Sequence, residues 1–261
     1  ELPSFPDIAL RIQKVLADEN VSPERVVRIA GSESALATRI LTMANSAALN
    51  PGGRRINDLR TAISRMGFDM LRSAALSFSM AQLRNAKEFK SIEKHMNALW
   101  QRSVLVAAYS YVVAKRHSTL SPDGAMLAGL LHGVGKLYIL TRASRLPGMF
   151  NDAAAYGTIV HNWHANISKA LLENWEMADE IVEAVHGYED QTREARGPVA
   201  LVDVLTVSNL FASFRDQPDL LELKLHEFRS AERLGIDRSA FEGVITDSAA
   251  EIISLKEALG K

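Results

Sequence analysis

Apolar residues recur three and four positions apart along almost the whole chain. One such stripe consists of Ile8, Ile12, Val15 and Leu16, and another runs through residues 40–47. This spacing lines one face of an α-helix, whereas a sustained strand-type alternation is hard to find. The pattern therefore predicts an all-α fold.

Start and stop signals divide this helical sequence into many segments. Serine accepts hydrogen bonds from free amides and proline suits the first helical position, so Ser22-Pro23-Glu24 and Ser121-Pro122-Asp123 each predict the start of a helix. The helix over residues 40–47 is expected to be capped by Ser32 or Ser34. A proline and two glycines make the stretch from Asn50 to Gly53 a loop.

The remaining boundaries follow from similar signals. A helix from Asp58 is expected to stop at Gly67, and Asp69 is expected to cap the next one. Further helices are predicted over residues 89–117, 150–156, 159–174, 178–187 and 198–214, with two or three shorter ones after Pro218. The polar stretch 189–197 is the best candidate for a mobile loop, in which Glu189 and Asp190 are expected to be solvated.

Composition narrows the range of partners and locations. The 261 residues carry 30 basic and 31 acidic side chains, and the net charge of −1 removes the broad attraction that nucleic-acid binding uses. Because there is no cysteine, a cytoplasmic location is the default. The most apolar stretch, Ala125 to Val134, is too short to span a bilayer and is expected to be a buried helix. Since the chain starts with Glu1, we interpret it as trimmed or as a fragment, and further domains stay open.

Four of the seven histidines fall near predicted helices, and one stands in an informative motif. His132 begins the run His-Gly-Val-Gly-Lys, in which Gly133 has no side chain that could bind a metal. His161, His164 and His186 follow on later helices. A single histidine on a helix is more often a core or surface residue than a ligand, so only a shared arrangement would make these residues a site.

Several motifs occur in a specific order and spacing. The first group is Leu2-Pro3-Ser4-Phe5-Pro6, the run Ala44-Asn45-Ser46-Ala47, and the stretch from Ile56 to Gly67. The second group is Leu99-Trp100-Gln101-Arg102-Ser103, residues 127–135, and His164 with Trp175 and His186. The first group resembles the N-terminal lobe of the HDOD family, and the second resembles that family's degenerate His-Asp lobe. The resemblance spans roughly residues 2 to 214.

The resemblance implies both an architecture and a role. An HDOD domain is expected over residues 1–215, with an N-terminal helical lobe over about 1–85 and a His-Asp-like lobe over about 86–215. Residues 216–261 are expected to form a helical extension packed on the same unit. The implied role is a non-enzymatic module of bacterial signal transduction that acts through a protein partner. A cyclic dinucleotide or another nucleotide is the candidate small ligand.

Related catalytic families hold a metal with ligands that this chain has lost. They place histidines where it has Arg102 and Gly187, an aspartate where it has Gly133, and a late aspartate near Asn209. Imidazoles alone are a poor match to hard metal ions, and a guanidinium repels a dication. We therefore expect a vestigial pocket without catalytic residue, metal or cofactor. Its predicted members are Arg102, His132, Gly133, Lys136, His164, His186 and Asn209.

Three alternatives stay open for this pocket. Arg102 can pair with an acid on a neighbouring helix. It can instead form an anion-binding site with Lys136 and the histidines, which would make the chain a nucleotide sensor. Finally, substitute ligands such as Asp123, Asp203 or Glu173 would restore a metal-dependent phosphohydrolase.

Two further groups of residues have structural explanations. The three glycines of residues 129–135 would allow another backbone, or a bulky side chain such as Trp100, to approach the helix closely. Asn45 and Ser46, which with Trp100 are motif residues of the family, are expected to fasten a turn through side-chain hydrogen bonds. A contact role of this pair at the junction between the lobes stays open.

Overall fold

The computed structural model describes residues 7–18, 20–146, 148–194 and 196–260, so the motif over residues 2–6 lies outside the described residues. This part of the chain is helical and contains no strand, as predicted. The first elements are α1 (Asp7–Leu16), α2 (Pro23–Gly31), α3 (Ser34–Ala44), α4 (Leu59–Arg84), the 3-10 helix η1 (Lys87–Ile92) and α5 (Glu93–His117).

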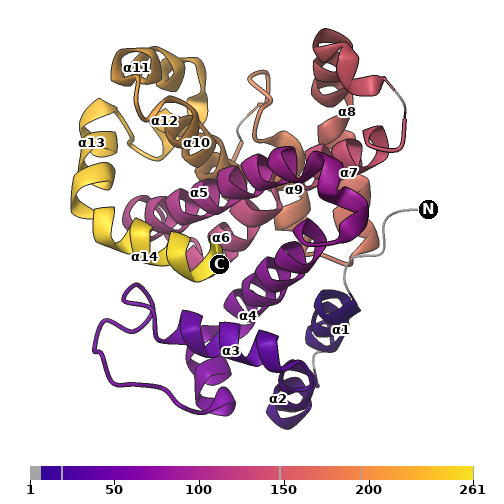
Figure 1. Cartoon of the computed structure of the whole chain (residues 1–261). Coiled ribbons are helices and arrows are strands. Elements are labelled where there is room, and N and C mark those ends of the chain that lie inside the picture. Colours follow the sequence, from indigo (N-terminus) through magenta and orange to yellow (C-terminus); the bar gives the residue numbers. More distant parts are fainter. Residues whose placement is uncertain (1–6, 19, 147, 195, 261) are drawn as a thin grey trace.

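The later elements surround α5, which crosses the centre of the molecule (Figure 1). They are α6 (Pro122–Leu131), α7 (Val134–Ala143), the 3-10 helix η2 (Met149–Asn151), α8 (Ala153–Asn174), α9 (Asp179–Gly187), α10 (Leu201–Phe214), α11 (Pro218–Glu227), α12 (Arg229–Arg233), α13 (Arg238–Asp247) and α14 (Ala249–Gly260). Helices α1 to α3 lie at one end of the molecule, and α11 to α14 follow one side of α5 and α10 (Figure 1).

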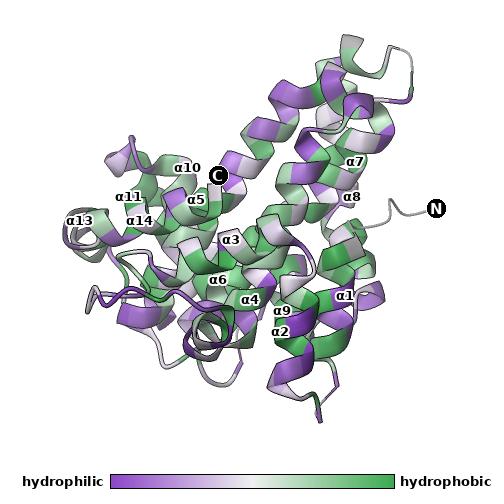
Figure 2. Cartoon of the chain, turned by 60° about the horizontal axis from the view of Figure 1, so that its bottom comes forward, coloured by the Kyte–Doolittle hydropathy of each residue, from purple (hydrophilic) through white to green (hydrophobic). Residues whose placement is uncertain are grey.

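The hydrophobic core forms where other helices meet α5 and α6. Residues 124–131 of α6 and 106–114 of α5 are all buried. A helix that is apolar on every side is stable only in an interior. Hydrophilic residues lie mainly on the outer helices and loops (Figure 2). Nearly all buried apolar residues form one continuous cluster from Ile8 to Leu259.

Several predicted boundaries are confirmed. Ser22, Asp58 and Ser121 each cap the following helix, because the side-chain oxygen accepts the backbone N–H three residues later. The break at Gly67 is also present, since φ of 76° interrupts the helical backbone inside α4. These features depend on local geometry, which the sequence specifies directly.

Other predicted caps are wrong. Neither Ser32 nor Ser34 caps α3, whose N-cap is Glu33 without a side-chain hydrogen bond. The hydroxyl of Ser32 donates instead to a carbonyl at the end of α2. Asp69 lies inside α4, pairs with Arg72 at 2.7 Å, and accepts no cap hydrogen bond from a backbone N–H of the described residues.

The division into helices also differs from the prediction. The helix expected to carry His132 ends at Leu131, and His132 and Gly133 form the turn to α7. The two helices predicted over 150–156 and 159–174 are one helix, α8, since the single Gly157 between them weakens a helix by only about 1 kcal/mol. The C-terminal segment contains four helices rather than two or three.

Two glycines allow close backbone approach. A Cβ atom on Gly129 would lie 2.5 Å from Ala107 Cα of α5, and one on Gly135 would lie 2.1 Å from the carbonyl oxygen of His164 in α8. The partner is thus another backbone, and Trp100 is not among the nearest neighbours. Gly133 is looser, with the nearest atom, Oγ of Ser103, at 3.1 Å.

Residues 122–143, which form α6 and α7, are apolar and long enough to cross a membrane by length and composition. It is the one segment of this kind in the described residues, and 78% of its most apolar window is buried inside the protein. Core helices have this property. The prediction that Ala125 to Val134 is buried is confirmed.

Candidate functional site

A pocket of about 410 Å³ opens between α5, the turn from α6 to α7, and α10. The structure brings together five of the residues that sequence reasoning selected, namely Arg102, His132, Gly133, Lys136 and Asn209. The other lining residues are Leu99, Ser103, Glu189 and Ser213. Ser213 lies one helical turn after Asn209 on α10, a spacing that could have revealed it.

Arg102 is held by α10 rather than by an acid. Its Nη2 donates to the side-chain oxygen of Asn209 at 2.7 Å, to the backbone oxygen of Asn209 at 2.9 Å, and to the hydroxyl of Ser213 at 2.6 Å. Among the described residues no carboxylate forms an ion pair with Arg102, so the alternative in which it pairs with an acid is wrong. The positions facing the guanidinium carry an amide and a hydroxyl. Burial lowers the pKa of Arg102 from its ordinary value.

His132 is buried at the turn between α6 and α7. Its Nδ1 lies 2.7 Å from the carbonyl oxygen of Gly129, so Nδ1 carries the hydrogen and Nε2 is left as an acceptor. The ring of Tyr188 packs edge-on against the imidazole, with centroids 5.5 Å apart. Burial lowers the pKa of His132 to about 3, and the hydrogen bond to Gly129 opposes this only in part. His132 is therefore neutral near pH 7.

Glu189 is the charged pocket residue that sequence reasoning did not assign to the pocket. One carboxylate oxygen lies 2.8 Å from Nζ of Lys136 and the other lies 3.0 Å from Nε2 of His164. Burial alone would raise the pKa of Glu189, but the hydrogen bond from His164 and the charge of Lys136 outweigh it and hold the pKa well below its ordinary value. The side chain is 39% exposed, in line with the expectation of a solvated acid, but its pairing with Lys136 and His164 was not predicted.

The loop over residues 189–197 is anchored beyond Glu189 as well. Asp203, fully buried at the start of α10, forms ion pairs with Arg193 of the loop and with Arg233 of α12. It also accepts a hydrogen bond from Ser230 at 2.8 Å. A buried carboxylate needs such partners. These contacts attach the loop to α10 and α12 at Arg193, while the predicted mobility of the loop stays a prediction.

The donors of the pocket do not fit a divalent metal ion. No group of three or more His, Asp or Glu side chains is arranged to hold a metal anywhere in the described residues. In the pocket His132 offers one ring nitrogen, both oxygens of Glu189 are engaged, and Arg102 and Lys136 contribute positive charge. A divalent ion requires several neutral or anionic donors that converge.

The proposed substitute ligands do not reach this pocket. Asp203 is committed to Arg193 and Arg233. Glu173 is exposed near the C-terminal end of α8. Asp123 lies in the first turn of α6, about 14 Å along the helix from His132 at a rise of about 1.5 Å per residue.

Two predicted pocket members, His186 and His164, lie outside the pocket lining, as does the motif residue Trp100. His186 is exposed at the end of α9, and its Nε2 lies 3.1 Å from Oδ1 of Asn166. His164 is buried behind Glu189, and its Nδ1 has no hydrogen-bond partner in the described part of the chain. Trp100 is buried on α5, with the guanidinium of Arg84 5.7 Å from its ring centroid.

The motif residue Asn45 fastens the loop that follows α3. Its Nδ2 donates to the carbonyl oxygens of Leu41 and Ile56, and its Oδ1 accepts the N–H of Ile56, all at 2.8 Å. This is the turn-fastening role that the sequence predicted. The hydroxyl of Ser46, by contrast, is buried without a hydrogen-bond partner among the described residues, so its predicted share in that role is not observed.

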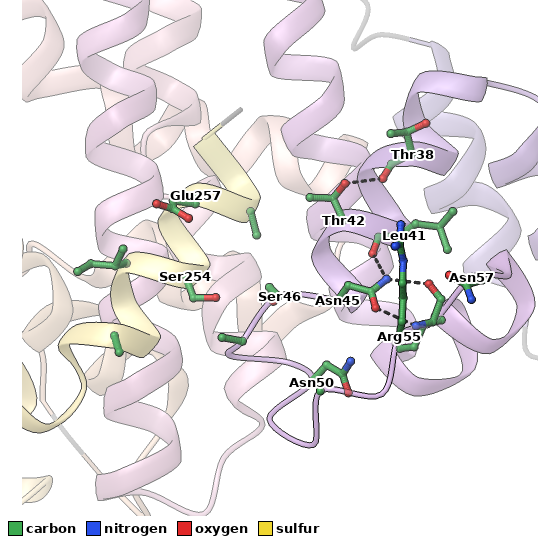
Figure 3. Close-up of a pocket in the computed structure, with 16 residues that line it drawn as sticks. Thr38, Leu41, Thr42, Asn45, Ser46, Asn50, Arg55, Asn57, Ser254 and Glu257 are labelled. Atoms are coloured by element: carbon green, nitrogen blue, oxygen red, sulfur yellow. Dashed lines mark hydrogen bonds between the residues drawn. The ribbon is translucent and has the colours of Figure 1, made fainter.

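Asn45 and Ser46 also line a groove of about 1120 Å³. Figure 3 shows these residues facing Ser254 and Glu257 of α14 across the groove. The N–H of Ala48 donates to Oγ of Ser254 at 3.2 Å. The contact near this motif is therefore with the C-terminal helix rather than with the His-Asp-like lobe.

The chain is similar to several proteins of known structure. A protein from Shewanella amazonensis SB2B, described as a candidate metal-dependent phosphohydrolase, is 28% identical with a TM-score of 0.77, covering 99% of this chain and 92% of the other. An HDOD domain protein of unknown function from Geobacter sulfurreducens is 24% identical with a TM-score of 0.70, covering 99% and 93%.

Sequence comparison gives the family. An uncharacterized protein of Treponema pallidum (strain Nichols) is 20% identical over 230 residues, which are 83% of this chain, and the chain spans 43% of that relative's length. The model of the HDOD domain matches residues 2–191, a range that contains Arg102, His132 and Glu189. The chain therefore belongs to the HDOD family.

Proposed function

We propose that the chain is a non-enzymatic module of bacterial signal transduction, which binds a protein partner in the cytoplasm and responds to a small ligand in its pocket. The observation that carries the proposal is the guanidinium of Arg102 bonded to Asn209 and Ser213. In related phosphohydrolases, histidine and aspartate ligands occupy the corresponding positions. A permanent cation there opposes the binding of a dication. The signalling role is what membership of the HDOD family implies.

Metal analysis tests the non-enzymatic part of the proposal. Protein purified without added metal is expected to contain far less than one equivalent of iron, manganese or zinc and to leave phosphodiesters intact. A triple variant with Arg102→His, Gly133→Asp and Asn209→Asp returns an imidazole and two carboxylates to the pocket, and it is expected to gain metal. At position 133 the hydroxyl of Ser103, 3.1 Å from the new Cβ, has to move slightly.

The opposite result would favour the phosphohydrolase that the Shewanella protein is described to be. That result is near-stoichiometric metal in the unaltered protein together with hydrolysis, both lost in His132→Ala. The partner is tested separately by affinity capture in the source bacterium, followed by binding of the purified partner to the purified chain. A chain that recovers nothing above background contradicts the interaction role.

A further inference from the structure

We infer that the pocket binds a phosphate-bearing small molecule between Arg102 and Lys136, and that Glu189 is a built-in competitor which the phosphate displaces from Lys136. This inference rests on the ligand-sensing part of the proposed function and names its ligand class and its regulation. It follows from the charge of the pocket, from its free hydrogen-bond donors and from the position of Glu189.

The pocket carries more positive than negative charge. Arg102 and Lys136 are both cationic, His132 is neutral near pH 7, and Glu189 is the one carboxylate among the described lining residues. Glu189 is paired with Lys136 and acts on the half-buried guanidinium of Arg102 only from beyond ion-pairing distance, so Arg102 has no directly paired counter-ion there. A partly buried cation without a counter-ion is unfavourable, and a bound anion relieves this.

Both cations have N–H groups that donate no hydrogen bond to the described residues. All hydrogen bonds of Arg102 to the described residues use Nη2, which leaves Nε and Nη1. Lys136 Nζ contacts Tyr188 and Glu189, so one of its three hydrogens is left. A phosphate has enough oxygens to bind both cations at once. His132, whose Nε2 is an acceptor, can bind the hydrogen of a singly protonated phosphate.

The volume suits a phosphate attached to a small organic group. The pocket measures about 410 Å³, within the range of about 300 to 1,000 Å³ that is typical of small-ligand sites. Polar side chains of Ser103, Asn209 and Ser213 line the remaining wall. They can bind hydroxyl groups of the organic part.

The position of Glu189 allows its side chain to move away from Lys136. Its side chain is 39% exposed, and it is held by ion pairs with Lys136 and His164 and by a hydrogen bond with the hydroxyl of Tyr188. It begins a loop in which Gln191 makes one exposed hydrogen bond to Glu227 at 3.5 Å and Arg193 forms an ion pair with Asp203. Displacement of Glu189 is therefore expected to move residues 189–192 only. Binding of a ligand in the pocket then moves a surface segment that a partner can detect.

Calorimetric titration of the metal-free full chain in EDTA, at constant ionic strength, tests the site with inorganic phosphate and adenosine monophosphate. Arg102→Gln should weaken binding about tenfold to a hundredfold, because a charge-assisted hydrogen bond is lost. Glu189→Gln should tighten binding about tenfold, because the competitor loses its charge. The matched controls Glu194→Gln, on the same loop, and Arg116→Gln, on an exposed pair, should bind like the unaltered protein.

Hydrogen–deuterium exchange of the unaltered protein provides a second measurement that needs no variant. Saturating phosphate should speed exchange in residues 189–192, because the hold of Glu189 is released. Absence of saturable binding of both probes at about 10 mM would overturn the site. Binding without faster exchange, or without tighter binding by Glu189→Gln, would overturn the displacement. The titrations and exchange measurements use metal-free protein, so a negative result in them counts against this inference alone. The proposed function would be overturned by a different result, namely metal-dependent hydrolysis.

Discussion

Three residues make the charge of the pocket more positive, namely Arg102, Gly133 and Asn209. Relative to a site with one histidine and two aspartates at these positions, the chain lacks two negative charges and gains one positive charge. At an effective dielectric of about 20, two unit charges about 4 Å apart interact by about 4 kcal/mol. These three residues thus make the binding of a cation electrostatically unfavourable.

The buried His132 should make folding stability depend on pH. Its pKa of about 3 in the folded protein lies below the ordinary value of 6.5, so below pH 6.5 the unfolded chain binds more protons than the folded one. Stability is then complete above about pH 6.5 and falls as the pH drops toward 3. Between pH 8 and pH 5 the loss is about 2 kcal/mol. Urea unfolding at each pH measures it.

The variant His132→Asn should remove most of this loss. His117, whose pKa burial also lowers, contributes a further part and is retained in the variant. Glu189 affects stability in a different pH range. Because its pKa is lowered on folding, its contribution to stability is complete above about pH 4.5 and is lost only as the pH falls below that value. The exposed His161→Gln is the control and should keep the full pH dependence. An unchanged profile in His132→Asn would contradict the assignment.

Asn45 should be the more important residue of the Asn-Ser pair. The change Asn45→Ala removes three hydrogen bonds that join Leu41 to Ile56, and each contributes about 1 kcal/mol. We expect the free energy of unfolding to fall by about 2 to 3 kcal/mol in urea titrations. Asn50→Ala, which loses one exposed hydrogen bond to Arg54, is the control and should cost less than about 1 kcal/mol. Equal losses would show that the loop is not fastened by Asn45.

At the scale of helices, two glycines decide how closely the layers pack. Gly129 lets α6 contact the backbone of α5, and Gly135 lets α7 contact the backbone of α8. The contact at Gly135 is reinforced by its N–H, which donates to Oγ of Ser168 at 3.0 Å. These approaches bring Arg102 on α5 and Lys136 on α7 to one pocket.

Replacing glycine by alanine should have opposite effects on stability at a position of close backbone contact and at an exposed helical position. Gly135→Ala puts a methyl group 2.1 Å from a backbone oxygen, so the helices have to separate, and we expect a loss of about 3 kcal/mol or more, or failure to fold. Gly157→Ala lies in α8 with no atom within 4 Å and should stabilise the protein by about 0.5 to 1 kcal/mol. Thermal unfolding of both variants measures the difference. A tolerated Gly135→Ala would contradict the close approach.

At the scale of the whole molecule, Asp203 joins segments that are far apart in the sequence. Its carboxylate links the loop at Arg193, the start of α10 and the C-terminal helix α12 at Arg233. Phe211 of α10 adds a ring contact to Phe241 of α13, with centroids 4.7 Å apart. We propose that residues 216–261 belong to the same folded unit, and that the boundary near residue 85 separates two lobes that share one core.

Replacing Asp203 should therefore weaken the whole fold. Asp203→Asn leaves Arg193 and Arg233 without their buried partner, and loss of one member of a buried ion pair costs about 3 to 5 kcal/mol. Asp216→Asn removes an exposed partner of Arg215 and should change stability by less than about 0.5 kcal/mol. Urea unfolding compares the two. Similar small effects would mean that the network does not join the C-terminal helices to the core.

The sequence by itself determined the helical class, the caps at Ser22 and Ser121, the helix start at Asp58, the break at Gly67 and the need for close approach at Gly129 and Gly135. Each of these depends on groups within about one helical turn or on the size of one side chain, so local chemistry specifies it. The family motifs, which are also patterns of sequence, added membership of the HDOD family.

Only the tertiary structure decided which residues share the pocket. Arg102 and its partner Asn209 are 107 positions apart, and Lys136 and Glu189 are 53 positions apart. No periodicity reports such pairs, because they form only when α5, α7 and α10 pack around one core. The same packing left His186 exposed and brought the partly exposed Glu189 into ion pairs with Lys136 and His164, since the direction of a side chain near a helix end depends on what the following loop contacts.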